Sequence, residues 1–451
     1  MNKIILSKFK LPVGIRLIVF PLFYFYSLTP VYSQDLYDLS RCIQTGLDNN
    51  FGLQAERNRE EISAINYTYG NAGMLPSVTA NNSFGGTVNA VNRNLRNGEE
   101  TSATGIHNTS ASASINLGMT IFRGFQVQNT YKKLGQLNEL EVLTTQMAVE
   151  NLVGRIAAEY NYYIEQLTLY KNLAYAISLS RERVRIDEQR YLLGSASKLE
   201  LLQSLVYLNA DSSRYSRQSA VLRSAQIRLN ELMASEDLGK NIVLKDTLIQ
   251  INEMLSYDEL LKKTMVYNTS MQIASKNQIV SALDYKIIKS CSYPYLNLST
   301  GYGYNYNGYG TGDLLNQRLH GMNYGLSLGM DLFDGLNRKR EKSVARIGIE
   351  NTNIHFKEVE QEVKADLLNI FFAYENNIRL LRLEEKNLAV ARENLQIALE
   401  RYKLGNLAGL ELREVQKSLL DAEERLISIK YLTKLAEISL LQISGSIMDF
   451  M

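Results

Sequence analysis

The sequence predicts a mainly α-helical protein with a smaller β-structured part, built from two copies of one long unit. Three observations lead to this prediction. Landmarks in the first half recur in the second half at a constant spacing. Each half contains a long proline-free stretch with an amphipathic stripe, and each half contains a pair of alternating segments rich in Gly, Ser and Tyr.

The internal duplication rests on several unrelated landmarks. The segment that begins at Gly118 (GMTIFRG) recurs at Gly329 (GMDLFDG), and the segment that begins at Arg190 (RYLLG) recurs at Arg401 (RYKLG), both at an offset of 211 residues. Upstream, Asn50, Gln54 and Pro76 match Asn268, Gln272 and Pro294 at an offset of 218. The change of offset places an insertion in the first half, between the proline and the glycine landmarks. The period is far too long for a solenoid repeat, so one large unit has been duplicated.

Four short β-segments are predicted next to the two prolines that follow residue 33. Pro76 and Pro294 each end a helix-like stretch, because proline lacks an N–H and clashes with the preceding helical turn. Each proline is followed by a strand, a polar loop (Asn92–Gly105 or Asn307–Gln317) and a second strand (Ser110–Phe122 or Tyr324–Phe333). The alternation is typical of strands in outer-membrane barrels. Four strands cannot close such a barrel. Either the barrel is shared between subunits, or these strands lie outside a membrane.

Long helices are predicted between these hairpins. The stretches Gly124–Gly194 and Gly335–Gly405 carry apolar residues at near-heptad spacing, and each predicts a helix of about 60–65 residues, or about 90–100 Å. A helix of this length needs antiparallel neighbours to cover its apolar stripe. The segments Lys198–Ser235 and Leu410–Ser444 are expected to return alongside, and Asp38–Tyr69 and Tyr257–Lys289 are expected to form shorter helices.

The N-terminus and the composition narrow the possible classes of protein. Residues 1–33 have a basic start, an apolar run and small residues before position 34, so we expect a cleavable signal peptide; a membrane anchor is the alternative. The net charge of +2 argues against a nucleic-acid binder. Cys42 and Cys291 form no CxxC pattern, and the three histidines are scattered. We therefore predict no disulfide framework, no metal site, no cofactor and no enzymatic activity.

The order of these features resembles the TolC family of outer-membrane efflux proteins over essentially the whole chain after residue 33. The resemblance is carried by the opening helix with Asn50 and Gln54, the Leu-Pro-Ser junction at Pro76, the Phe-x-Gly steps, and the twin Arg-Tyr-x-Leu-Gly turns followed by Leu-Glu-Leu. It implies a homotrimer with an α-helical periplasmic barrel and a 12-stranded transmembrane β-barrel to which each protomer gives four strands. It also implies two kinds of partner, a periplasmic adaptor (a membrane fusion protein) and an inner-membrane pump of the RND or ABC type.

The resemblance also implies roles for particular residues. Tyr191, Gly194, Tyr402, Gly405 and Leu407 match the periplasmic tips that contact the adaptor, and Glu200, Glu411 and Glu414 match the acidic constriction of the pore. For the three glutamates, a solvated helix face is an equally good interpretation, because the dipole favours acidic residues near a helix N-terminus. A well-known enterobacterial member has a basic residue at the position of Leu407. We therefore expect packing of the helix ends, rather than a salt bridge at that position, to close the tip.

The prediction for the whole chain has four parts: a signal peptide (1–33), a first TolC-like repeat (34–235), a linker (236–255) and a second repeat (256–451). The predicted function is an export channel in the outer membrane. A secreted coiled-coil structural or adhesin-like protein without a pore is the alternative, although a fibrous coiled coil has no reason to contain twin β-hairpins. The cargo cannot be identified from the sequence.

Overall fold

The computed structural model describes residues 36–450, so the predicted signal peptide at 1–33 lies outside the described residues. The first unit contains β1 (Leu36–Tyr37), α1 (Leu39–Asn49), α2 (Phe51–Asn66), β2 (Ser77–Asn94), β3 (Glu100–Arg123), α3 (Gln126–Leu192) and α4 (Lys198–Leu232). The predicted linker contains β4 (Val243–Leu244), and the second unit contains α5 (Tyr257–Tyr267), α6 (Thr269–Ser290), β5 (Tyr295–Gly308), β6 (Asn316–Gly329), α7 (Asn337–Lys403), α8 (Gly409–Ile443) and the 3₁₀ helix η1 (Ile447–Phe450).

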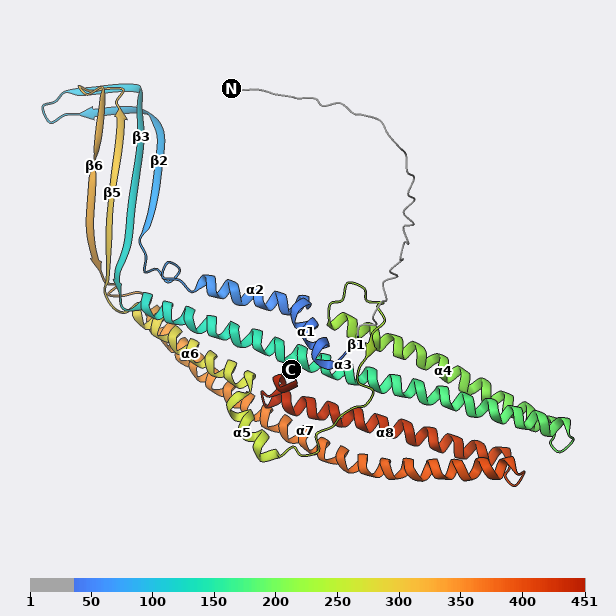
Figure 1. Cartoon of the computed structure of the whole chain (residues 1–451). Helices are drawn as coiled ribbons and strands as arrows, with labels where there is room; N and C mark the ends of the chain where they lie inside the picture. The colour runs from blue at the N-terminus through green and yellow to red at the C-terminus, as the bar shows by residue number, and fades with distance from the viewer. Residues whose placement is uncertain (1–35, 451) are drawn as a thin grey trace, which may run out of the picture.

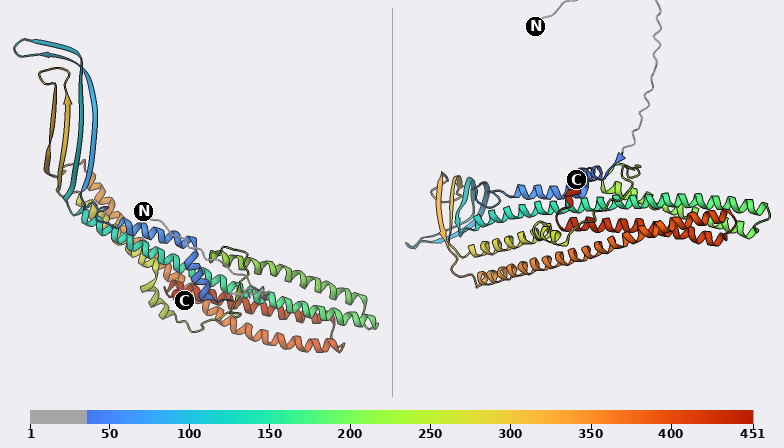
Figure 2. Two further views of the ribbon diagram at one scale, coloured as in Figure 1. Left: turned by 45° about the horizontal axis from the view of Figure 1, so that its top comes forward. Right: turned by 60° about the horizontal axis from the view of Figure 1, so that its bottom comes forward.

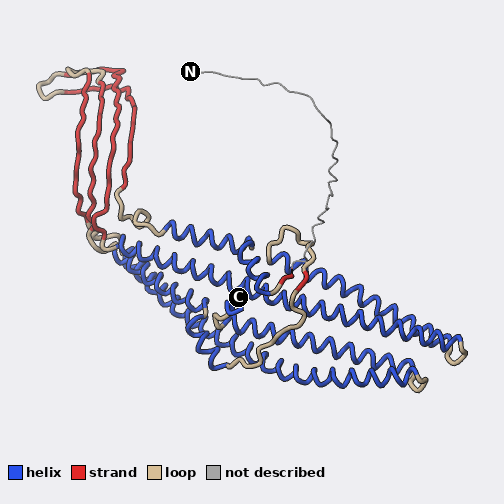
Figure 3. Tube along the Cα trace, viewed as in Figure 1, coloured by secondary structure: helices blue, strands red, loops and turns tan. Residues whose placement is uncertain are grey.

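The molecule is elongated, with the β-sheet at one end and two helical hairpins at the other (Figure 1). Figure 3 shows that the strands β2, β3, β5 and β6 are confined to the first end and that helices form nearly all of the rest. The hairpins α3/α4 and α7/α8 run side by side and end in two short turns, as the views in Figure 2 also show. None of the described helices is long and apolar enough to cross a bilayer.

The long helices α3 and α7 each contain 67 residues, slightly more than predicted, and span about 100 Å at 1.5 Å per residue. Helix α3 packs along α4, α6 and α8, so it belongs to the interior of the bundle. Its middle carries a buried cluster that includes Leu152, Val153, Ile156 and Tyr160. A second cluster closer to the turns joins α7 to α8 through Leu395, Tyr402, Leu412 and Leu419.

The two N-terminal helices of the units are not continuous, contrary to the prediction. Asn50 separates α1 from α2, and Asn268 separates α5 from α6. Each side chain caps the second helix by accepting a hydrogen bond from the backbone N–H of Leu53 or Met271. A residue in extended conformation with a short polar side chain favours a helix start over a helix interior. This is why the predicted single helices are broken.

The same two asparagines also connect helices end to end. The Asn50 amide donates to the carbonyl oxygen of Leu232 at the end of α4 (3.1 Å), and the Asn268 amide donates to that of Ile443 at the end of α8 (2.9 Å). Helix α2 therefore continues the direction of α4, and α6 continues that of α8 (Figure 1). We refer to these two connections as the splices.

The four long strands form one antiparallel sheet in the order β2-β3-β5-β6, so β2 and β6 are its edges. The predicted loop Asn92–Gly105 is mostly strand, because β2 extends to Asn94 and β3 begins at Glu100. The polar residues pair across the two strands, and Gly98, at φ +86°, provides the tight turn. Strand β6 begins at Asn316 and ends at Gly329, whereas the predicted strand continued to Phe333.

Pro76 and Pro294 each stand directly before a strand, β2 or β5. The preceding helices end several residues before the prolines, so the prolines do not themselves end them. Helix α2 ends at Asn66, because a turn-rich segment separates it from Pro76, while α6 continues to Ser290. The prolines thus mark where strands begin rather than where helices end.

The splice at Asn268 gives a first testable prediction. Asn268→Ala removes both the cap and the link to Ile443, so it is expected to lower stability by about 1–2 kcal/mol. Asn268→Asp keeps an accepting oxygen for the cap but loses the donor, so its effect should be intermediate. Thermal unfolding, followed by circular dichroism, ranks the stability of the parent and the two variants. Equal stability of the alanine variant and the parent would contradict a structural role for this side chain.

Candidate functional site at the hairpin tips

The two turns that end the hairpins share one backbone geometry. Gly194 and Gly405 have φ values of +73° and +80°, which L-residues with a Cβ rarely adopt. The N–H groups of Gly194 and Ser195 bond back to the carbonyls of Tyr191 and Arg190, and the second turn repeats this pattern. These paired bonds satisfy the last carbonyls of α3 and α7.

Tyr402 joins the second hairpin to the first. Its side chain is 2% exposed, and its hydroxyl donates to the carboxylate of Asp187 on α3. Burial, together with the bond to Asp187, raises the pKa of Tyr402 to about 12, so the hydroxyl stays protonated at any physiological pH. Arg190 lies over the Tyr402 ring at 4.6 Å and also donates to the Tyr402 backbone carbonyl. The tips are therefore held together by one tyrosine and two charged partners.

Tyr191 occupies the equivalent position in the first unit and behaves differently. It is 40% exposed, whereas Tyr402 is buried. The two tips are therefore equivalent in backbone but not in contacts, and Tyr191 remains available at the end of the hairpin.

A second contact between the hairpins lies further from the turns. Arg413 on α8 forms two bonds to the carboxylate of Asp211 on α4, at 2.7 and 2.8 Å. Asp211 also accepts a hydrogen bond from Ser180 on α3 (2.6 Å). The Asp211 side chain is 1% exposed and that of Arg413 is 12% exposed, so this ion pair is shielded from water.

The ring of Tyr207 on α4 lies between two guanidinium groups. Arg413 and Arg183 each approach its centroid to 5.0 Å. Arg183 is buried on α3 and lies 3.7 Å from Asp187, the residue that accepts the Tyr402 hydroxyl. Ion pairs and cation–π contacts thus form one continuous polar layer through α3, α4, α7 and α8. We call these residues, Ser180, Arg183, Asp187, Arg190, Tyr207, Asp211, Tyr402 and Arg413, the tip network.

The three predicted acidic residues lie outside the tip network. Glu200 is exposed and accepts from the backbone N–H of Ser197 in a capping box, which matches the helix-terminus interpretation of this residue. Glu411 and Glu414 are exposed at the start of α8. Leu407, in contrast, is half-buried and packs on the apolar cluster of α7 and α8.

Most residues of the tip network were not predicted from the sequence. Tyr402 was predicted through the turn motif, but Arg183, Asp187, Asp211 and Arg413 have the pattern of ordinary charged residues on long helices. The available signal was their position near the apolar stripe. A charged residue at such a position must find a partner on a neighbouring helix.

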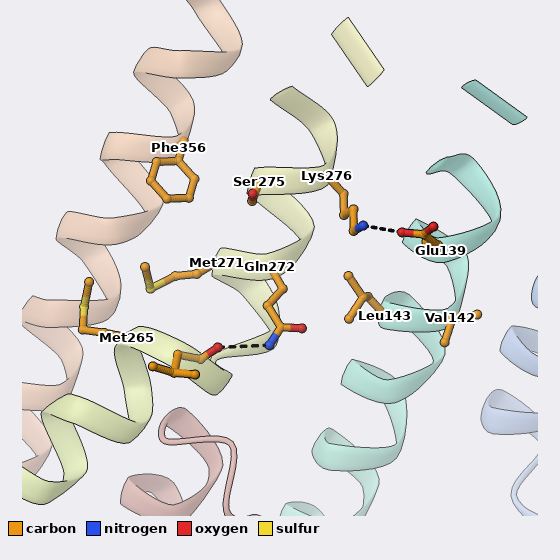
Figure 4. Close-up of a pocket in the computed structure, with 10 residues that line it drawn as sticks. Glu139, Val142, Leu143, Met265, Met271, Gln272, Ser275, Lys276 and Phe356 are labelled. Atoms are coloured by element: carbon orange, nitrogen blue, oxygen red, sulfur yellow. Dashed lines mark hydrogen bonds and ion pairs between the residues drawn. The ribbon is translucent and has the colours of Figure 1, made fainter. Parts of the chain in front are cut away.

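A separate groove of about 610 Å³ lies between α3, α5, α6 and α7 (Figure 4). Its walls are mainly apolar, with Leu143, Met265 and Met271, and an ion pair between Lys276 and Glu139 crosses one side. The groove holds no nucleophile with an adjacent base. Among residues 36–450, no group of three His, Cys, Asp or Glu side chains is placed to hold a metal.

Comparisons with known proteins agree with this architecture. Residues 260–446 match the family model described as outer membrane efflux protein. No curated protein matches the chain. Among solved structures, the outer-membrane channel CmeC of Campylobacter jejuni has a TM-score of 0.76 at 15% identity, covering 91% of this chain and 86% of that one. VceC from Vibrio cholerae gives 0.71 at 14% (90% and 96% covered), and the open state of MtrE from Neisseria gonorrhoeae gives 0.67 at 16% (91% and 89%).

The fold is that of outer-membrane channels with a helical bundle below a β-sheet. More particularly, the chain has the TolC-like fold, and its second unit is an outer membrane efflux protein domain. The predicted fold class is thereby confirmed, and the predicted resemblance to this family is confirmed for residues 260–446, which match its model.

The shielded pair between Arg413 and Asp211 gives a second prediction. Arg413→Ala leaves a buried carboxylate without its counter-charge, which typically costs about 3–5 kcal/mol. Removing both partners in the double variant Asp211→Ala/Arg413→Ala should cost less than the sum of the single changes. Hydrogen exchange of the backbone amides in the halves of α4 and α8 nearer the turns measures the local loss of stability.

A matched control is the exposed pair of Arg382 with Glu253 (3.0 Å; side chains 64% and 47% exposed). Arg382→Ala should barely change exchange rates, because solvent screens such pairs. If Arg413→Ala behaved like Arg382→Ala, the tip network would not hold the hairpins together.

Proposed function

We propose that this chain is one subunit of an export channel in the outer membrane, which receives cargo from an inner-membrane pump through a periplasmic adaptor. The observation that supports this proposal most strongly is the combination of the efflux-protein domain at 260–446 with a sheet that has one apolar and one polar face. We also propose the division into repeats at 34–235 and 256–451, with the linker at 236–255.

One face of the sheet is mainly apolar in the half next to the helices, where Asn82 and Thr300 are its polar members; His320 and Arg318 lie on the same face nearer the outer turns. Cross-strand partners share a face and alternate residues point to opposite faces. The apolar face is formed by Val78, Ala80 and Phe84 of β2, Ala113, Ile115 and Leu117 of β3, Leu296, Leu298, Tyr302 and Tyr304 of β5, and Met322, Tyr324, Leu326 and Leu328 of β6. Phe84 and Tyr324 are 82% and 84% exposed. Such a surface suits lipid, with tyrosines near the membrane interface.

The opposite face is mostly small and polar over the same part of the sheet, with Arg123 and Tyr295 at its end next to the helices and Leu319 nearer the outer turns. It is formed by Ser77, Thr79, Asn81 and Ser83 of β2, Ser110, Ser112, Ser114 and Asn116 of β3, Asn297, Ser299, Gly301 and Gly303 of β5, and Asn323, Gly325 and Ser327 of β6. This face suits a water-filled lumen. The sheet therefore has the lipid-out, water-in pattern of a pore wall.

The open edges β2 and β6 indicate that several copies complete the wall. An unpaired strand edge in lipid leaves backbone N–H and C=O groups without partners, which costs several kcal/mol for each group. Pairing of edges between subunits removes this cost. By resemblance to TolC, three copies would form a homotrimer with 12 strands, contacting outer-membrane lipid on the apolar face.

The helices would then form a periplasmic tunnel that narrows at the tips. Gly194 and Gly405, with Tyr191 and Leu407, would face the adaptor, while Glu200, Glu411 and Glu414 would contribute the constriction. Relatives of this kind are channels rather than enzymes. No observation favours the alternative of a poreless secreted coiled-coil protein, since the paired hairpins and the fold both match the channels.

Orientation is testable by cysteine labelling in whole cells. The β2–β3 turn at Gly98 and the hairpin tip at Ser195 are separated by the length of α3, about 100 Å, plus the sheet. Gly98→Cys should react with an impermeant maleimide on intact cells, whereas Ser195→Cys should react only after the outer membrane is permeabilised. Both variants carry Cys291→Ser, because Cys291 is exposed. The opposite labelling pattern would refute the proposed orientation.

The constriction is testable by electrophysiology. Rings of Glu411 and Glu414 in a narrow passage would attract cations and repel anions. The double variant Glu411→Ala/Glu414→Ala should therefore shift the single-channel reversal potential in a salt gradient towards zero. Glu385→Ala, which removes an exposed carboxylate that pairs with the partly exposed Lys430, is a control of similar chemistry further along α7 from the tip. An unchanged reversal potential in the double variant would assign these carboxylates to a solvated helix face.

A further inference from the structure

Basic side chains gather where α6 and α7 meet the sheet. Helix α6 ends at Ser290, shortly before β5 begins at Tyr295, and α7 begins at Asn337, shortly after β6 ends at Gly329. At 1.5 Å per residue, two lysines of α6 and three cations of α7 lie within about 15 Å of these helix ends. With one tyrosine between them they form what we call the basic cluster: Tyr285, Lys286, Lys289, Lys339, Lys342 and Arg346.

The antiparallel packing of α6 and α7 brings these residues together. The Gln278 amide donates to Asn353 (2.9 Å), and nearer the sheet Arg338 lies 3.5 Å from the carbonyl oxygen of Cys291. Between these two contacts, the register places Tyr285 opposite Arg346, and one turn further it places Lys289 opposite Lys342. Lys339 follows on the same side of α7, one turn from Lys342.

The cluster has no compensating carboxylate. In the part of the chain that the structure describes, none of its five cations forms an ion pair with Asp or Glu. The nearby carboxylates are paired with other cations, in the pairs Lys133–Asp284 (2.6 Å), Arg338–Asp334 (2.9 Å) and Arg340–Glu341 (3.4 Å). Like charges that are gathered without a counter-charge repel, so an anion bound among them would be stabilised.

The hydroxyl of Tyr285 reports the positive potential of the cluster. A hydrogen bond from Arg346 lowers the pKa of Tyr285 below its ordinary value, and the charges of Arg346, Lys289 and Lys342 lower it further against the opposing effect of burial. The three cations therefore act on one point between the two helices, as a phosphate-binding group of side chains would.

The first unit shows that packing does not require these charges. The offsets of 218 and 211 residues relate Tyr285 to Tyr67, Lys342 to Tyr131 and Arg346 to Gly135. There the Tyr67 and Tyr131 rings stack with their centroids 4.7 Å apart, and a Cβ at Gly135 would lie 3.1 Å from the Tyr67 ring. The same position is thus closed by aromatic stacking in one unit and carries uncompensated cations in the other.

The basic cluster lies on the side of the bundle that carries α5. Lys286 and Lys289 continue the row of α6 residues that starts at Ser275 with spacings of four and three, and Ser275 lines the groove next to α5 (Figure 4). On α7, Lys342 lies two heptads before Phe356, which lines the same groove. Three copies of α5 on the inner side would obstruct a tunnel, so this side faces outward in the proposed channel.

We infer that the basic cluster binds the phosphate groups of anionic phospholipids in the periplasmic leaflet of the outer membrane. The inference rests on the proposed channel and its orientation. The polar headgroup layer lies where the apolar part of the sheet ends and is about 5–8 Å thick, and long Lys and Arg side chains bring their charges to it. Cations at a membrane surface attract anionic lipids, and tyrosine suits the same depth.

Lipid binding to the full-length protein in detergent tests this inference. Native mass spectrometry compares phosphatidylglycerol, which is anionic, with phosphatidylcholine, which has no net charge. The parent is expected to bind phosphatidylglycerol more tightly. In Lys289→Gln/Lys342→Gln/Arg346→Gln, its affinity should fall about fivefold for each cation removed, or about a hundredfold in all, while phosphatidylcholine binding stays unchanged.

Two control variants separate charge from folding and from total charge. Lys289→Arg/Lys342→Arg/Arg346→Lys keeps every charge and should keep the preference for phosphatidylglycerol. Lys171→Gln/Arg214→Gln/Arg217→Gln removes three exposed cations about 65 Å along the bundle from the sheet and should also keep it. The native mass of each variant shows whether its assembly is that of the parent.

The outcomes distinguish the lipid site from the channel itself. Loss of the preference in the glutamine variant of the cluster alone supports the inference. An unchanged preference overturns it, and so does a shifted single-channel reversal potential without a change in lipid binding, because that result places the cluster in the lumen. In both cases a conducting channel leaves the proposed function standing. A parent protein that forms no channel in a planar bilayer overturns both.

Discussion

The length of α3 and α7 is the constraint on which the rest of the structure depends. A helix of 67 residues presents about 100 Å of apolar stripe, and no neighbour within its own unit covers all of it. Within its own unit, α3 packs on α4 towards the turns and on α1 and α2 towards the sheet, while α6 and α8 of the other unit cover a further side. This arrangement satisfies α3 and leaves α7 half covered. Duplication of one unit in one chain therefore solves the burial problem for only one of the two long helices.

The sequence was informative where a regular period runs over many residues. Local patterns predicted three features that the structure has. They are the apolar stripe on the long helices, the twin turns at Gly194 and Gly405, and the order of the strands along the chain. It was less informative at the boundaries. Asn50 and Asn268 were recognised as repeated landmarks, but their role in breaking a helix depends on a carbonyl at the end of another helix. A partner 182 or 175 residues away is not visible in a local pattern.

The tips show why duplicated sequence does not imply duplicated contacts. Both units carry the same Arg-Tyr-x-Leu-Gly motif, yet Arg190 and Tyr402 come from different copies of it and pair with each other. Their counterparts, Arg401 and Tyr191, are exposed. The two hairpins meet side by side, so one motif faces inward and the other faces outward. The tip network was therefore not predictable from the motif. The two hairpins pack against each other asymmetrically, so equivalent residues of the two units make different contacts.

Because of the splices at Asn50 and Asn268, the helical part of the molecule contains two kinds of long helical element. Two rods, α3 and α7, are continuous from the sheet to the tips, whereas α4–α2 and α8–α6 are interrupted halfway and joined by single amide hydrogen bonds. A continuous helix connects its two ends through an unbroken backbone. In the interrupted pairs, the end of one helix meets the start of the next through a side-chain hydrogen bond. Helices α4 and α8 are held to their neighbours by packing and by the tip network, but neither continues as one helix to the strands. The only unbroken helical paths between the tips and the sheet in the part of the chain that the structure describes are therefore α3 and α7.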